Sequence, residues 1–127
     1  LSINFLRRHL DINPDNHPLT MAFADALIEA RDYQQAATVL EGHALLRPND
    51  FSLWFRIAEI QGQAGDISKV HQARSEYFML IGDYRSARDQ LQFALRVEAE
   101  NGITAATEAR LRQKIRNIET SQQQARN

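Results

Sequence analysis

The chain has 127 residues, of which 43% are hydrophobic and 24% charged; this balance excludes wholesale disorder and fits one compact domain or a short run of repeats. Fifteen Lys and Arg residues against sixteen Asp and Glu residues give a net charge of −1, which argues against a nucleic-acid partner because phosphate binding needs a concentrated basic surface. The absence of cysteine excludes disulfides, thiolate zinc sites and thiol nucleophiles. No apolar run approaches the ~20 residues that a membrane span needs.

Apolar residues recur at three- and four-residue steps along the chain, which is the periodicity of amphipathic helices. No segment alternates apolar and polar residues, so no strand is predicted. Turns rich in proline, glycine and asparagine divide the chain into about seven helices, at roughly residues 2–12, 18–30, 33–46, 51–64, 67–81, 84–99 and 103–121. Short connections predict that consecutive helices run antiparallel. The stretch 122–127 has no apolar anchor beyond Ala125 and is expected to be a frayed tail.

Independent helix breakers are separated by a 34-residue offset, which relates Pro14 to Pro48 and Asp32 to Asp66. Such an offset predicts a repeated helix–turn–helix unit. The first helices of two units carry the matching sets Thr20, Phe23, Ala24 and Leu27, then Trp54, Ile57, Ala58 and Gln61. The second helix of the earlier unit carries Asp32, Tyr33, Ala36, Leu40, Ala44 and Pro48. Over about residues 1–100 this pattern resembles the tetratricopeptide (TPR) family, which implies an all-α, TPR-like α-solenoid that binds protein.

The resemblance implies a single TPR domain over residues 1–127. Its expected parts are the end of a truncated repeat (1–14), a repeat (17–50), a second repeat (51–82), an overlapping half-shifted repeat (68–100), a C-terminal capping helix (103–121) and the frayed tail (122–127). Small residues should let the helix axes approach, while Trp54 should fill a wider gap and be buried.

The repeat is expected to be irregular near 67–81. Gly65-Asp66 and Gly82-Asp83 are only 17 residues apart, half a repeat, so the helix between these turns should contact both of its neighbours. Its Phe78 forms a better repeat unit with the residues that follow than Val70, Arg74 and Tyr77 form with those that precede.

A narrower resemblance lies in residues 71–94, around His71, Arg74, Glu76-Tyr77-Phe78 and Gly82-Asp83-Tyr84. This stretch is similar to the C-terminal TPR region of the periplasmic HExxH zinc metalloproteases of the BepA/YfgC type. The resemblance implies a periplasmic location, a role in outer-membrane β-barrel protein assembly and quality control, and partners among the barrel-assembly machinery and unfolded outer-membrane proteins. Because the chain lacks HExxH and begins at Leu1, we expect a domain of a longer parent, with zinc only in that parent's protease domain.

No catalytic, cofactor-binding or metal-binding residues are predicted. The histidines, His9, His17, His43 and His71, have no helical ligand spacing, and His71 is expected to serve helix packing and hydrogen bonding. Carboxylate pairs such as Asp25 and Glu29 are typical of solvated helices, and no glycine-rich phosphate loop is present. Basic residues concentrate in the last helix, at Arg110, Arg112, Lys114 and Arg116, and a solubilising cap is the favoured interpretation.

The predicted functional surface is the groove lined by the first helices of the repeats. Its residues are Met21, Asp25, Ile28, Glu29, Phe55, Arg56, Glu59 and Gln63. An apolar ring beside an arginine is a typical anchor for a protein partner. One alternative is a stand-alone TPR scaffold without a protease partner domain, and another is an enzyme fragment whose helices contribute catalytic groups.

Overall fold

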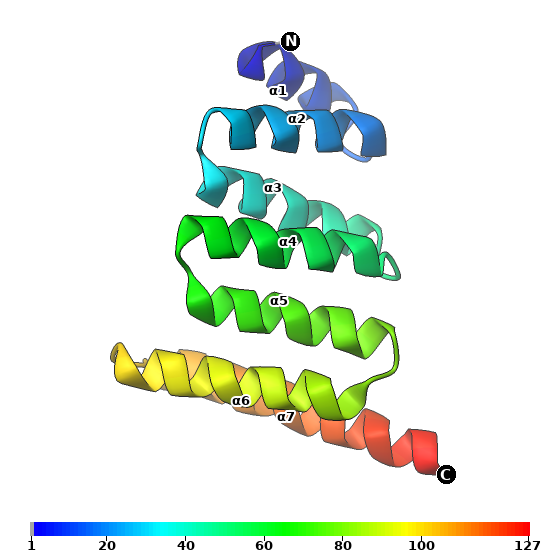
Figure 1. The fold of residues 1–127 in the computed structure, drawn as a ribbon. Helices are drawn as coiled ribbons and strands as arrows, with labels where there is room; N and C mark the ends of the chain where they lie inside the picture. Colours follow the sequence, from blue (N-terminus) through cyan, green and yellow to red (C-terminus); the bar gives the residue numbers. More distant parts are fainter. Residues whose placement is uncertain (1) are drawn as a thin grey trace.

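A computed structural model describes residues 2–127, and this part of the chain is all-α, with seven helices and no strand (Figure 1). The helices are α1 (Ile3–Ile12), α2 (His17–Glu29), α3 (Tyr33–Leu46), α4 (Phe51–Ala64), α5 (Ile67–Leu80), α6 (Tyr84–Glu100) and α7 (Ala105–Arg126). None of these helices is long and apolar enough to cross a membrane. The presence of seven helices and no strand among residues 2–127 confirms the all-α prediction.

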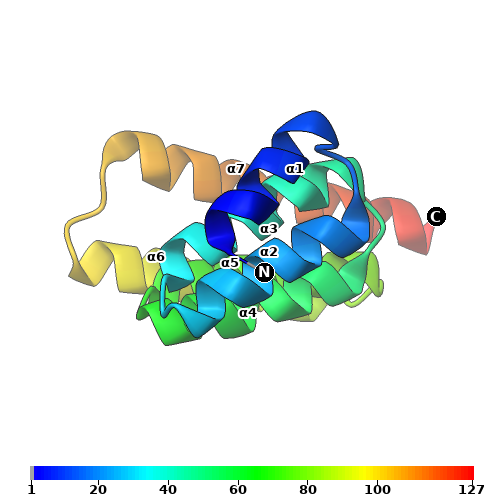
Figure 2. The same ribbon diagram turned by 90° about the horizontal axis from the view of Figure 1, so that it is seen from above.

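Consecutive helices alternate in direction and each packs against the next, from α1 to α7 (Figure 1). The helices α1 to α6 follow one another down the molecule, and α7 turns back to lie behind α6 (Figure 1). Figure 2, the view from above, shows α7 on the side of the stack opposite α4 and α6. The prediction that α5 contacts both α4 and α6 is confirmed, and these are the two most extensive helix pairs in the chain.

One turn geometry recurs at three helix ends. The amides of Asp32, Asp66 and Asp83 each donate to the carbonyl five residues back, and each aspartate then caps the next helix with its side chain. The residue before each aspartate has positive φ: 61° at Arg31, 81° at Gly65 and 82° at Gly82. This is the Schellman arrangement, in which a left-handed residue closes the helix and satisfies its last carbonyls.

The left-handed position in this turn suits glycine, because a Cβ atom crowds the backbone there. Gly65→Ala is expected to lower the free energy of unfolding by about 1 kcal/mol, whereas Arg31→Gly is expected to raise it by up to about 1 kcal/mol. Urea melts of the two variants measure both changes. Equal effects of the same sign would contradict the assignment of the two turns to one geometry.

The interior consists of two apolar clusters. The first joins α1 to α5 and includes Leu6, Leu27, Leu40 and Ile57, with Ala24, Ala36 and Ala58 at close helix approaches. The second joins α6 to α7 through Ala87, Leu91, Ala94, Leu111 and Ile118. α5 contributes to both, because Ala73 belongs to the first cluster and Phe78 and Met79 pack against the second.

Two predictions from the sequence need correction. The last helix does not end at residue 121, because α7 continues through most of the stretch 122–127, as far as Arg126, and Ser121 and Gln122 are half-buried. Glutamine and arginine favour helix, and no glycine or proline interrupts the segment. Trp54 is half-buried rather than enclosed: it packs against the first cluster but also lines two cavities, one between α3, α5 and α7 and one between α5, α6 and α7.

Candidate functional site

The structure places the predicted groove residues on α2 and α4. Met21 and Ile28 are half-buried and pack against the first apolar cluster, so they lie beneath the surface of the predicted groove and present little area to a partner. Asp25, Glu29, Phe55, Glu59 and Gln63 are exposed, and Arg56 is half-exposed.

Arg56 joins the two helices electrostatically. Its guanidinium lies 3.7 Å from a carboxylate oxygen of Asp25 on α2 and 3.8 Å from one of Glu59 on its own helix. The three side chains are solvent-exposed, so the pairs contribute little to stability, but they hold Arg56 and Glu59 to one another. Two carboxylates therefore share this one cation on the surface of the folded chain.

Aromatic side chains gather on the adjoining face of α4 and α5. The ring of Tyr77 lies 6.0 Å from the ring of Phe51, 5.8 Å from that of Phe55 and 5.5 Å from that of Phe78, measured between centroids. Phe51 is 50% exposed and Phe55 57% exposed, while Tyr77 and Phe78 are half-buried. These four residues, which we call the aromatic cluster, present apolar rings to solvent where α4 meets α5.

A cavity of about 280 Å³ opens beside the aromatic cluster, between α4 and α5. Its lining is mainly apolar, with one acidic and one basic residue at its edge: Phe55, Ala58, Glu59, Gly62, Val70, Arg74, Tyr77 and Phe78. We call this cavity the α4–α5 pocket. Arg74 is exposed and has no ion pair within 4.0 Å among residues 2–127.

Phe55 and Glu59 were predicted from the sequence as groove residues, whereas the pocket residues that α5 supplies were not. Val70, Arg74 and Tyr77 follow a four- and three-residue spacing and so share one helix face. These three residues match the core positions of the repeat pattern poorly, and in the structure they line a surface pocket. That poor fit was the signal available in the sequence.

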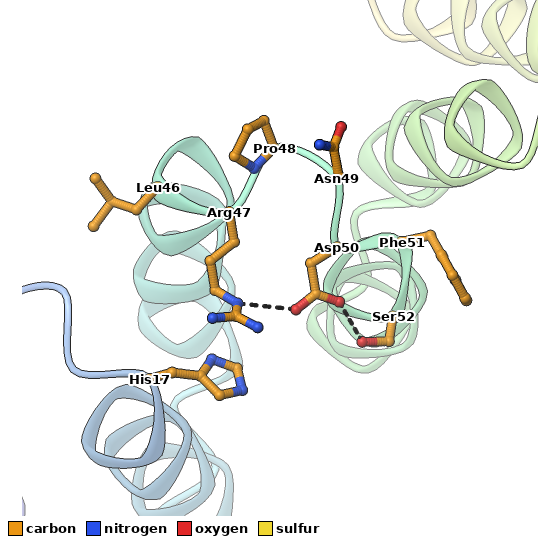
Figure 3. A pocket seen from close by; sticks show the side chains of 8 residues that line it. All are labelled: His17, Leu46, Arg47, Pro48, Asn49, Asp50, Phe51 and Ser52. Atoms are coloured by element: carbon orange, nitrogen blue, oxygen red, sulfur yellow. Dashed lines mark hydrogen bonds and ion pairs between the residues drawn. The ribbon is translucent and has the colours of Figure 1, made fainter.

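Another hollow on the surface is different in character. It has a volume of about 750 Å³, is broad and shallow, and lies where the α3–α4 turn meets the start of α2 (Figure 3). Arg47 donates to Asp50 at 3.0 Å, and the Ser52 hydroxyl donates to the same carboxylate, so these charged groups satisfy one another. The hydrogen bond from Ser52 is the main cause that holds the pKa of Asp50 below its usual range. Arg47, Asp50 and Ser52 therefore stabilise the α3–α4 turn through hydrogen bonds to one another.

His17, at the edge of that hollow, forms a pair with His43. The Nδ1 atom of His17 is 2.8 Å from Nε2 of His43, and the two rings stack with centroids 5.1 Å apart. His43 is 3% exposed, and its Nδ1 atom has no hydrogen-bond partner among residues 2–127. Burial is the main cause that lowers the pKa of His43 below its ordinary value of 6.5; His17 and Arg47 lower it further, and Asp50 opposes them.

The buried His43 predicts acid sensitivity. Because its pKa is lower in the folded chain, the unfolded chain binds more protons below pH 6.5. The full contribution of neutral His43 to the free energy of unfolding is therefore present above that pH. Below it, the free energy of unfolding is expected to fall by at most about 1.4 kcal/mol per pH unit, until His43 becomes protonated in the folded chain as well. Urea melts between about pH 7.5 and about pH 5 measure this slope.

His43→Gln is expected to flatten the slope, whereas His9→Gln, a change at an exposed position of α1, should preserve it. A wild-type stability that stays constant over this pH range would contradict the prediction.

His71 serves packing, as the sequence predicted: its Nδ1 atom lies 2.8 Å from Oε1 of Gln90 and ties α5 to α6. The basic residues of α7 are also engaged. Lys114 pairs with Glu76 on α5 at 3.2 Å, Arg110 donates to Gln72 on α5, and Arg112 pairs with Glu108 within α7. The contacts of Lys114 and Arg110 fasten α7 to α5.

Within residues 2–127, no group of three or more His, Cys, Asp or Glu side chains is arranged to hold a metal ion. No protein-family model and no curated protein matches the chain. The exposed groove residues Asp25, Glu29, Glu59 and Gln63 and the half-exposed Arg56, together with the aromatic cluster and the α4–α5 pocket, form what we call the α2–α4–α5 face. This face and the sequence resemblance are the basis for a functional proposal.

Proposed function

We propose that this chain is a TPR-like α-solenoid that binds unfolded or extended protein on its α2–α4–α5 face. The observation that carries the proposal is the exposed aromatic cluster, which places Phe55 next to Arg56 and beside an open pocket. Aromatic and arginine side chains dominate binding energy in protein interfaces more often than other types. Mixed charge around apolar rings suits a polypeptide better than a nucleic acid.

The solenoid interpretation has its own support. Helices pack on their neighbours in chain order, and the same turn recurs at Arg31, Gly65 and Gly82, at spacings of one repeat and half a repeat. Such a surface is already rigid, so a partner need not order it on binding.

The resemblance of residues 71–94 extends the proposal to the biological setting. We propose that the chain is the TPR domain of a periplasmic metalloprotease-chaperone and that its partners are unfolded outer-membrane proteins and the barrel-assembly machinery. Zinc and catalysis belong to the parent's protease domain in this proposal, so incubation of the chain with zinc and an unfolded protein should give no cleavage.

The experiment uses a urea-denatured outer-membrane porin, diluted into buffer with the purified chain, and follows aggregation by light scattering. The wild-type chain is expected to suppress aggregation. The double variant Phe55→Ala/Arg56→Ala should do so with about tenfold lower potency while keeping a nearly unchanged helical melt.

The control variant Arg112→Ala/Arg116→Ala changes α7 only and should behave as wild type. If the control variant loses activity and the Phe55/Arg56 variant keeps it, the functional face is α7 and the proposal is wrong.

A further inference from the structure

The α4–α5 pocket is small for a drug-sized ligand and large enough for one side chain. Its volume is about 280 Å³, at the lower limit of pockets that enclose small molecules. The walls are apolar and aromatic, and Gly62 leaves room on the α4 side, where even a Cβ atom at position 62 would lie 3.8 Å from Cγ2 of Val70. A large aliphatic or aromatic side chain therefore fits these walls.

The two charged residues at the pocket edge, Glu59 and Arg74, differ in whether they already form an ion pair. Glu59 lies 3.8 Å from the guanidinium of Arg56, which it shares with Asp25, so Glu59 already has a cation partner on the folded chain. Arg74 has no ion pair among residues 2–127 and is exposed to solvent. Arg74 is thus the cation beside the apolar walls that has no carboxylate partner in the described part of the chain, and the complement of its guanidinium is a carboxylate.

We propose that the α4–α5 pocket receives one large apolar side chain of an extended protein segment in which an adjacent acidic residue pairs with Arg74. This inference rests on the proposed function and assigns its contact chemistry. The apolar side chain contacts Phe55, Tyr77 and Phe78, and the carboxylate lies over the outer edge of α5. Arg74 selects among apolar segments by the charge that flanks them.

The test is an NMR titration of the ¹⁵N-labelled chain with three peptides in one Gly/Ser frame. They contain aspartate–phenylalanine, lysine–phenylalanine or aspartate–alanine at the centre. The aspartate–phenylalanine peptide is expected to shift the amides of Gly62, Val70, Arg74 and Tyr77. It should bind about two- to fivefold more tightly than the lysine–phenylalanine peptide, the range typical of an exposed ion pair. The aspartate–alanine peptide should bind most weakly, because it leaves the pocket empty.

Arg74→Glu is the decisive variant, since an exposed helix position tolerates the change and the variant should invert the preference toward the lysine–phenylalanine peptide. Equal binding of the two phenylalanine peptides, no binding by any peptide, or shifts confined to α2 or to the α3–α4 turn would overturn the inference.

The porin assay separates this inference from the proposed function. If porin aggregation is still suppressed through Phe55 and Arg56 while the peptide preference is missing, the inference fails and the proposed function stands. If the chain does not suppress aggregation at all, the proposed function fails.

Discussion

Leu40→Ala is expected to lower the free energy of unfolding by about 3–4 kcal/mol. Leu40 lies in α3, is 0% exposed and belongs to the cluster that joins α1 to α5. Its removal forfeits the transfer energy of the side chain and leaves a cavity between close-packed helices that cannot collapse freely.

Leu45→Ala provides the matched control, because it is the same substitution in the same helix at a position that is 81% exposed. We expect a change within about 0.5 kcal/mol. Urea melts followed by circular dichroism measure both variants. Similar losses in the two would mean that the burial pattern of α3 is wrong.

Trp54→Ala is expected to cost about 3 kcal/mol, at the lower end of the range for large aromatic residues because the side chain is half-buried. Trp54 packs against the first apolar cluster and lines both cavities that face α7. The alanine variant would therefore also enlarge the cavities between α5 and α7.

Because Trp54 is the single tryptophan, its own fluorescence cannot follow this comparison, and far-UV circular dichroism is the appropriate measurement. Trp54→Phe keeps an aromatic ring at the same place and should recover about half of the loss. A cost near zero for the alanine variant would show that the side chain contributes no packing.

The helices were predictable because nearly every boundary carries a local chemical signal. Asp32, Asp66 and Asp83 are helix caps whose role can be read from residue type and position. Where such a signal is missing, prediction failed: the end of α7 has no glycine or proline, and its length depends on the packing of Ser121 and Gln122. Arg31 was also unpredictable as a left-handed residue, since arginine gives no local indication of positive φ.

The candidate site was predictable only in part. Phe55 stood out because an aromatic residue next to Trp54 lies on another face of the helix, and Arg56 because it is the single basic residue among the predicted groove positions. Which residues of α5 reach the pocket depends on the rotation of α5 about its axis. The turns on either side of α5 are half a repeat apart, so the repeat pattern did not determine which face of α5 meets α4. The His17–His43 contact joins residues 26 positions apart through two ring orientations, and no sequence pattern encodes these.

The position of α5 in both apolar clusters has a consequence for how the chain opens. Ala73 faces the cluster of the first helices, while Phe78 and Met79 face the cluster of the last two. Opening of the α6–α7 end therefore has to break the extensive packing between α5 and α6, and it removes the support that α5 has on that side. Phe78, which packs against the second cluster, also lines the α4–α5 pocket. A segment bound in the pocket therefore lies against the helix that the two apolar clusters share.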